Sequence, residues 1–293
     1  MTAPTRDRRG FLQVAGGAVA AGLLGTSPAG AAGAKARVVL VRRREVLGAD
    51  GRVSGPVVHE MLNDAVAALL GERDAAPAWR RIVRPDDVVG VKTNIWERLR
   101  TPPELEEALR EEVVRAGVRR ENVAVDDRGV GSNPVFQRMT ALVNVRPMRT
   151  HAWSGLGTCL KNVIMFADNP PDYHGDSCAT LGALWQKPPL AGKVRLNVLV
   201  MLTPQFHSVG PHSFAREFTW PYCGLLVGLQ PVPVDATGAR IIQAKRRLHF
   251  GDGRPISPSP HHIEIAGSRY GLGPSDPAEI DLVPLGLAED VLV

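Results

Sequence analysis

The stretch that decides the fold is residues 88–127, VVGVKTNIWERLRTPPELEEALREEVVRAGVRRENVAVDD. It begins with an apolar strand at 88–91. Residues 101–104, Thr-Pro-Pro-Glu, then show a capping-box pattern with proline at the first helical position. Leucine and valine recur at four-residue spacing over 105–113, and a second apolar strand follows at 123–125. A strand, a helix and a strand in about forty residues predict a parallel crossover unit.

The rest of the chain extends this unit with further strands and helices. Short apolar runs predict strands over 38–41, 142–145, 196–202, 225–227 and 280–283. Helical spacing of apolar residues predicts helices over 57–70 and 233–248. The segments 79–85 and 255–260 are expected to be connectors. Charged residues make up 22% and hydrophobic residues 44%, the composition of a folded globular protein. We therefore expect an α/β fold in a single compact domain, with a mixed, mostly parallel sheet and helices on both faces.

The N-terminus has the pattern of an export signal. The segment 7–12, Asp-Arg-Arg-Gly-Phe-Leu, precedes an uncharged run over 11–25 that is too short to span a membrane. The paired arginines before a soft Ala/Gly-rich core resemble a twin-arginine signal, although an ordinary basic signal is the alternative. We expect a twin-arginine signal peptide over 1–36 and the α/β domain over 37–293. Export by the twin-arginine machinery would bring the protein to the periplasm or outside the cell, with the membrane contacted only through an uncleaved signal.

Charge and cysteine content exclude several classes of protein. The net charge is +5, but its arginines are scattered, and no helix-turn-helix or zinc-finger pattern is present, so we expect no nucleic-acid partner. The three cysteines form no Cys-x-x-Cys pair, so no iron–sulfur cluster is expected. An oxidising compartment would permit one disulfide, and the sequence does not select the pair.

Polar side chains follow the predicted parallel strands. Lys92 and Asn94 come after the strand at 88–91, and Asp126 and Asp127 end the strand at 123–125. Because ligands of open α/β sheets bind beyond the carboxyl ends of the strands, these side chains are expected to share one rim.

A second concentration of reactive residues lies further along the chain. Seven of the eight histidines and all three cysteines fall between His151 and His262. The glycine-rich segment 154–158 permits close backbone approach to a ligand, and Lys161 behind it would bind an anion or, if desolvated, form a Schiff base. The alternative is a turn followed by a surface lysine.

Other candidates have two interpretations each. His174, His207 and His212 would supply imidazoles to a transition metal, although their spacing matches no standard metal motif. Asp235 is either the N-cap of the following helix or a buried carboxylate facing Lys161 or Lys92. The pair at 261–262 is expected near a helix start in a polar, solvated role. No dinucleotide, phosphate-loop or serine-hydrolase motif is present.

Four segments resemble the domain of unknown function 362 family, in order and in spacing. They are 89–94 (VGVKTN), 143–145 (VNV) with Thr150-His151, 157–162 (GTCLKN) and 231–240 (PVPVDATGAR). The resemblance implies an α/β domain, often exported, and carries over to Lys92, Asn94, His151, Lys161, Asn162 and Asp235. The chain departs from the pattern at Arg149 and Gln230, and it lacks the cysteines of the iron–sulfur module found in some members.

These observations lead to a functional hypothesis. We expect an exported redox or isomerase enzyme, with a small anionic substrate or cofactor bound by Lys92, Asn94, Asn162 and Lys161. His151 would be the general acid/base, and Asp235 would orient a lysine or histidine. A distant similarity of layout to the nickel-dependent lactate racemases points to isomerase chemistry. The alternatives are a non-catalytic periplasmic protein that binds a solute or metal, and a structural partner of another exported protein.

Overall fold

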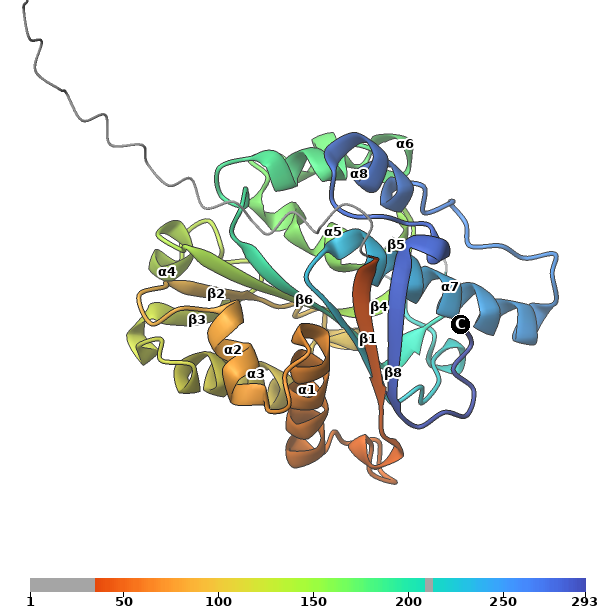
Figure 1. Cartoon of the computed structure of the whole chain (residues 1–293). Coiled ribbons are helices and arrows are strands. Elements are labelled where there is room, and N and C mark those ends of the chain that lie inside the picture. The colour runs from red at the N-terminus through yellow and green to blue at the C-terminus, as the bar shows by residue number, and fades with distance from the viewer. Residues whose placement is uncertain (1–34, 209–212) are drawn as a thin grey trace, which may run out of the picture.

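The computed structural model describes residues 35–208 and 213–293 (Figure 1). The predicted signal peptide over 1–36 therefore lies almost wholly outside the described residues. The first strand begins at Ala36, one residue before the predicted start of the domain, and pairs there with Ile280.

One eight-stranded sheet organises the domain. Its main path runs in the order β3-β2-β4-β6-β7-β1-β8, and β5 pairs with β4 beside this path. All neighbours on the path are parallel except at β7, which is antiparallel to both β6 and β1. The strands are β1 (Ala36–Arg42), β2 (Val89–Lys92), β3 (Val123–Asp126), β4 (Ala141–His151), β5 (Gly155–Gly157), β6 (Val194–Gln205), β7 (Gly224–Gly228) and β8 (Ile280–Gly286).

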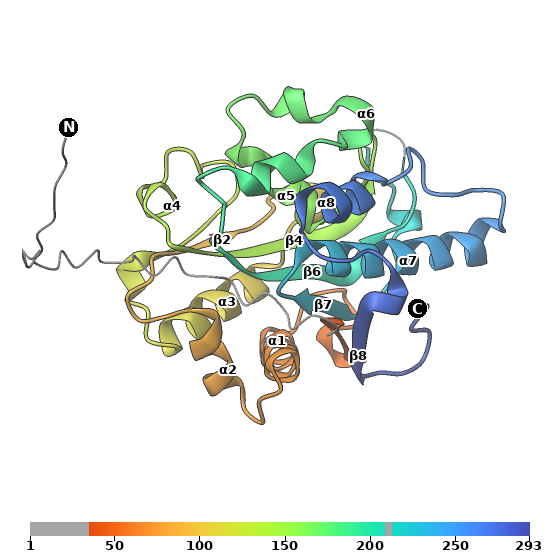
Figure 2. The same ribbon diagram turned by 45° about the horizontal axis from the view of Figure 1, so that its top comes forward.

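Helices cover both faces of this sheet (Figures 1 and 2). On one face lie α1 (Gly55–Leu70), α2 (Ala75–Ile82) and α3 (Pro103–Arg115). On the other lie α4 (Pro134–Gln137), α5 (Cys159–Asn162), α6 (Gly175–Cys178), α7 (Pro231–Phe250) and α8 (His262–Tyr270). Short 3₁₀ turns occupy 44–46, 97–99, 120–122, 163–166, 170–173, 181–186, 216–218 and 277–279.

Each helical layer closes its own apolar core against the sheet. Leu62 of α1 and Leu109 of α3 pack in a cluster with Val91 of β2. Ile241 of α7 packs in a second cluster on the opposite face with Leu199 of β6. The predicted class, a mixed and mostly parallel α/β sheet with helices on both faces, is confirmed.

Two local predictions are wrong. Residues 79–85 were expected to form a connector, but α2 extends to Ile82 because Trp79 is fully buried in the core and anchors its indole N–H to Asn63 Oδ1. Thr101 does not cap a helix. Its hydroxyl accepts a hydrogen bond from the backbone N–H of Asn94, and α3 starts at Pro103 without a side-chain cap.

The strand β4 is the element that most exceeds its prediction. It was expected over 142–145, but it runs from Ala141 to His151 and is buried along its whole length. The pairing register with β6 shifts between Pro147 and Arg149. Such a shift breaks the regular alternation of side chains and re-aims those that follow. The strand can therefore carry buried charged residues that point to one place.

Cys159, Cys178 and Cys223 are buried free thiols, so no disulfide pairs them in this structure. In the described part of the chain, no helix is long and apolar enough to cross a membrane.

Candidate functional site

A polar pocket of about 240 Å³ opens beyond the carboxyl ends of β2, β3 and β4. This is the edge at which the sequence predicted a shared rim, and Asn94 and Asp127 do lie there. The described residues that line it are Asn94, Trp96, Asp127, Arg128, Arg146, Arg149, His151, Trp153, Lys161, Asn162, Ile164, Met165, Pro170 and His174. Its size suits a molecule smaller than a typical drug-sized ligand, which needs roughly 300–1,000 Å³.

Arg146 is a buried guanidinium in the middle of a strand. It is 3% exposed, and its Nε has no hydrogen-bond acceptor among the described residues. Among the described residues, no carboxylate lies within ion-pair distance of the Arg146 guanidinium. Burial lowers its pKa to about 10, and only more distant groups, Asp127 first, act against this. An arginine in this state presents donors that an anion from solution can satisfy.

Arg149 adds a second buried guanidinium to the same pocket. It stacks on the ring of Trp96, with its Cζ 4.2 Å from the ring centroid, and its Nε also has no acceptor among the described residues. Burial, reinforced by the charge of Arg146, lowers its pKa to about 9. Two arginines three positions apart line one pocket because the register shift of β4 lies between them.

Lys161 lies on α5 and is 2% exposed. Within the described ranges its Nζ has no oxygen or nitrogen acceptor, and the Cys178 thiol is the polar group beside it. Burial is the main cause that lowers its pKa to about 8, while the Cys178 thiol beside it acts in the opposite direction. Lys161 is therefore a buried lysine, and the alternative of a surface lysine is wrong. With a pKa of about 8, roughly a tenth of its amine is neutral at pH 7, and the neutral amine is the reactive form.

His151 is the last residue of β4 and faces the pocket. The backbone N–H of Trp153 donates to its Nδ1 over 3.3 Å, so the imidazole is held neutral with its proton on Nε2. Burial, followed by the charges of Arg146 and Arg149, holds its pKa far below the usual value. The pKa of His151 is thus not near neutral as the sequence analysis assumed, and its role in acid–base chemistry stays a prediction. His151 is a neutral imidazole that gains basicity only when an anion offsets the nearby cations.

Lys92 was expected to bind the substrate, and the structure corrects this. It is fully buried behind the pocket, and its ammonium donates to Asp127 Oδ1, to the Thr93 carbonyl (2.8 Å) and to Asn162 Oδ1 (3.4 Å). All three donors are used within the protein. The pKa of Asp127 is lowered because Lys92 and the Ile95 amide outweigh the effect of its burial.

Asn162 and Asn94 have different positions in this network. The amide of Asn162 donates to Asn144 Oδ1 (2.8 Å) and to the Lys92 and Val145 carbonyls (3.1 Å each), so it ties α5 to β2 and β4. Its contacts give it a positioning role at the pocket wall. The Oδ1 of Asn94, in contrast, has no donor among the described residues and remains an open acceptor in the pocket lining.

Asp235 neither caps α7 nor faces a lysine. It lies inside α7, which begins at Pro231, and is fully buried. Its carboxylate accepts hydrogen bonds from the backbone amides of Cys159 (2.9 Å) and Leu160 (2.8 Å), at the start of α5. Burial raises its pKa to about 6 in spite of these bonds. The carboxylate is buried, as the second interpretation expected, but it faces backbone amides rather than a lysine, and its contacts fix the segment that carries Lys161.

The glycine-rich segment approaches protein rather than a ligand. It forms β5, which pairs with the end of β4. A side chain at Gly155 would come within 2.1 Å of the Pro258 carbonyl oxygen, and one at Gly157 within 2.6 Å of Nη2 of Arg146. Gly157 thus leaves the space that the guanidinium of Arg146 occupies.

The histidines proposed as metal ligands do not gather in the described residues. His174 stacks on Trp153 at the pocket, with ring centroids 4.3 Å apart, whereas His207 lies among Phe218 and Phe250 and contacts Arg246. His212 lies outside the described residues. Residues 35–208 and 213–293 hold no group of three or more His, Cys, Asp or Glu placed to bind a metal. The arginines and Lys161 around His174 would also repel a metal cation.

The histidine pair before α8 is only partly as expected. His261 is half-buried and contacts the Asp176 carbonyl, whereas His262 is fully buried. The solvated role predicted for His262 is therefore wrong. Burial lowers its pKa to about 3, and neither ring nitrogen has a partner in the described part of the chain.

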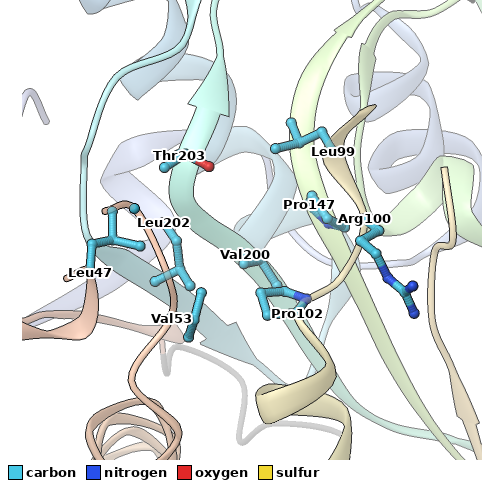
Figure 3. Close-up of a pocket in the computed structure, with 10 residues that line it drawn as sticks. Leu47, Val53, Leu99, Arg100, Pro102, Pro147, Val200, Leu202 and Thr203 are labelled. Carbon is cyan, nitrogen blue, oxygen red and sulfur yellow. The ribbon is translucent and has the colours of Figure 1, made fainter. Parts of the chain in front are cut away.

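A second hollow, of about 60 Å³, has fewer charged lining residues (Figure 3). Its walls are mostly apolar and include Leu47, Val53 and Leu202. Arg100 is its only charged lining residue among those described, and its side chain extends away from the apolar group (Figure 3). Reactive groups are concentrated in the larger pocket.

Comparisons with protein-family models, with curated proteins and with solved structures found no significant match to this chain. The resemblance to the domain of unknown function 362 family therefore stays a prediction. The site is defined by its own geometry as a buried cationic pocket at the carboxyl edge of an α/β sheet.

The residues that define this pocket most strongly are not those that the sequence singled out as ligand binders. Arg146, Arg149 and Trp96 had no functional role in the prediction. One signal pointed to them, because two arginines three positions apart interrupt an otherwise apolar segment next to a predicted strand. Charged residues in a buried strand are rare unless they are paired or bind a ligand.

Proposed function

We propose that this protein is an enzyme that binds a small anionic substrate in the polar pocket and transfers a proton on it, which is isomerase chemistry. The observation that carries the proposal is the excess of unpaired positive charge. Arg146, Arg149 and Lys161 line the pocket, while Asp127, the only carboxylate among its described lining residues, is bonded to Lys92.

The guanidinium groups of Arg146 and Arg149 favour an anion that carries at least two negative charges. Each guanidinium has a buried Nε without an acceptor, and planar guanidinium groups bind carboxylate or phosphate with two hydrogen bonds. Trp96 holds Arg149 from one side and Trp153 lies at the pocket with 42% of its surface exposed. The open acceptor of Asn94 would receive a hydroxyl or amine proton of the same molecule.

The same groups supply proton transfer. Lys161 has a pKa near 8, so its amine exists in both forms near neutral pH and can release or take up a proton, and His151 presents the Nε2–H of a neutral imidazole to the same substrate. Binding of an anion would offset the charges of Arg146 and Arg149 and raise the basicity of His151. An amine that exchanges protons with the substrate, beside an imidazole N–H that can polarise it, suits an isomerase, and this favours isomerase over redox chemistry.

The location of this activity remains tied to the N-terminal sequence. The paired arginines before the apolar run over 11–25 support export of the folded chain by the twin-arginine machinery to the periplasm or beyond.

Two measurements test the proposal. Calorimetric titration with glutarate and phosphate should show binding, and Arg146→Met should weaken it by about 10- to 100-fold, since a hydrogen bond to a charged group contributes roughly 1.5–3 kcal/mol. The matched control is Arg247→Met, at an exposed arginine near the end of α7, which should bind as the parent does. If neither anion binds, the proposal is wrong.

Catalysis is tested by proton exchange. Small 2-hydroxy and 2-oxo carboxylates are incubated in D₂O with the mature protein, and NMR follows the loss of C–H signal. His151→Gln should slow the exchange by about 100-fold, the scale of general acid–base catalysis. Anion binding without exchange on any member of the panel would instead support the alternative of a non-catalytic solute-binding protein.

A further inference from the structure

We propose that Lys161 forms an imine with the carbonyl group of a 2-oxo dicarboxylate whose two carboxylates are held by Arg146 and Arg149. The inference rests on the proposed function, because it uses the same anion site, and it names the substrate class. It assigns to Lys161 the role of nucleophile, and to His151 that of a hydrogen-bond donor to the carbonyl oxygen.

The environment of the Lys161 amine favours its neutral form. Lys161 lines the pocket and is 2% exposed, and its Nζ lies beside the Cys178 thiol with no oxygen or nitrogen acceptor in the described part of the chain. Lys92 is equally buried, but its three donors are used and it is not among the described residues that line the pocket. An amine without acceptors loses little when it gives up its proton, and the neutral amine is the nucleophile.

Two buried positive charges remain in the pocket when Lys161 is neutral, namely the guanidinium groups of Arg146 and Arg149. Neither guanidinium has an ion-pair partner among the described residues. A ligand with two carboxylates matches this charge, whereas a neutral aldehyde or sugar would leave both guanidinium groups unpaired. A carbonyl next to one carboxylate brings the electrophilic carbon to the same pocket as the amine.

His151 lines the same pocket. Its Nδ1 accepts a hydrogen bond from the Trp153 amide, so its Nε2–H is the group that it can present to the ligand. This N–H can donate a hydrogen bond to the carbonyl oxygen, which polarises the C=O bond towards attack by the amine of Lys161.

The reaction balances without an oxidant or reductant. The neutral Nζ of Lys161 adds to the carbonyl carbon, a C–N bond forms, and the C–O π bond opens to an alcohol as the nitrogen proton moves to oxygen. Loss of that oxygen as one water molecule gives the C=N bond. The net change is amine plus ketone to imine plus water, and hydrolysis returns both.

Reductive trapping tests the inference. The mature protein is incubated with 2-oxoglutarate, oxaloacetate or pyruvate together with sodium cyanoborohydride, and intact mass and peptide mapping locate the adduct. We expect one adduct on Lys161, formed faster with the two dicarboxylates than with pyruvate. Lys161→Arg, which keeps the positive charge but removes the amine, should lower the yield by at least about tenfold. Lys193→Arg, at a half-buried lysine before β6, should label as the parent does.

A parallel titration with glutarate, which has the two carboxylates but no carbonyl, separates the two proposals. Glutarate binding without a Lys161 adduct would overturn the imine and leave the anion site intact. Adducts spread over several lysines, or unchanged in Lys161→Arg, would overturn the imine as well. Absence of both glutarate binding and adduct would overturn the proposed function together with this inference.

Discussion

Replacing Lys161 with methionine should stabilise the empty protein. Methionine has a similar length and no charge, and the lysine amine has no oxygen or nitrogen acceptor to lose among the described residues. The pKa of Lys161 is lowered from 10.5 to about 8, mainly by burial. Since one pKa unit corresponds to about 1.4 kcal/mol, the buried ammonium costs roughly 3 kcal/mol of folding free energy at neutral pH. Lys161→Met should recover an amount of this order.

The gain in stability from Lys161→Met should fall as the pH rises. Below pH 8 the amine is protonated in both the folded and the unfolded protein, so the cost is complete. As the pH rises from about 8 to 10.5, the folded protein releases the proton while the unfolded chain keeps it, and the cost declines. The stability difference between Lys161→Met and the parent should therefore fall from roughly 3 kcal/mol at pH 7 to roughly 1 kcal/mol at pH 10.

Urea denaturation followed by circular dichroism at pH 7, 8, 9 and 10 measures this difference. Lys193→Met is the matched control, and its effect on the free energy of unfolding should be small and the same at each pH. A Lys161→Met variant that is less stable than the parent at pH 7, or a gain that does not change with pH, would refute the idea that Lys161 is a buried and unpartnered ammonium.

Three further predictions concern groups around the pocket. Gly157→Ala should weaken glutarate binding by about tenfold in calorimetry while leaving the fold intact, because its Cβ would come within 2.6 Å of Nη2 of Arg146 and displace that flexible group. Trp96→Leu should weaken it by only about two- to fivefold, since a partly exposed cation–π contact contributes roughly 0.5–1 kcal/mol. Burial raises the pKa of Asp235 in the folded protein from 3.8 to about 6, so folding favours the protonated carboxyl. This contribution to the free energy of unfolding is complete below pH 3.8 and is lost as the pH rises through 6. Urea denaturation should show this loss in the parent and not in Asp235→Asn.

The fold was largely predictable from local patterns. The crossover unit of β2, α3 and β3 follows from apolar periodicity and a proline at the helix start, and the two long helices α1 and α7 follow from periodicity alone. The order of the strands in the sheet, and the single antiparallel strand β7, depend on contacts between residues far apart in sequence. The helix α2 was missed because its length of eight residues and its arginines obscure the burial of Trp79.

The site was predictable in place but not in detail. Lys161 and His151 lie at the expected edge, yet the state of each depends on neighbours that local sequence does not identify. The proton of His151 is fixed by the Trp153 amide and by the charges of two arginines on its own strand. Lys92 has the same residue type as Lys161, and only the three-dimensional contacts with Asp127 and Asn162 show that its ammonium is already satisfied.

The unpaired cations of the pocket are best explained by a ligand rather than by the fold. A buried charge without a partner destabilises a protein, and apolar residues at Arg146, Arg149 or Lys161 would form a more stable empty domain. A bound dianion would supply the missing partners, and it would stabilise the folded protein by RT ln(1 + [L]/Kd). Substitution of one of these cations should therefore have opposite effects on the stability of the ligand-free protein and of the protein with a bound dianion. Arg146→Met should leave the empty protein as stable as the parent or more so, and should reduce the rise in melting temperature that saturating glutarate produces. Loss of stability in the empty variant, with an unchanged response to glutarate, would instead place Arg146 in the structural framework.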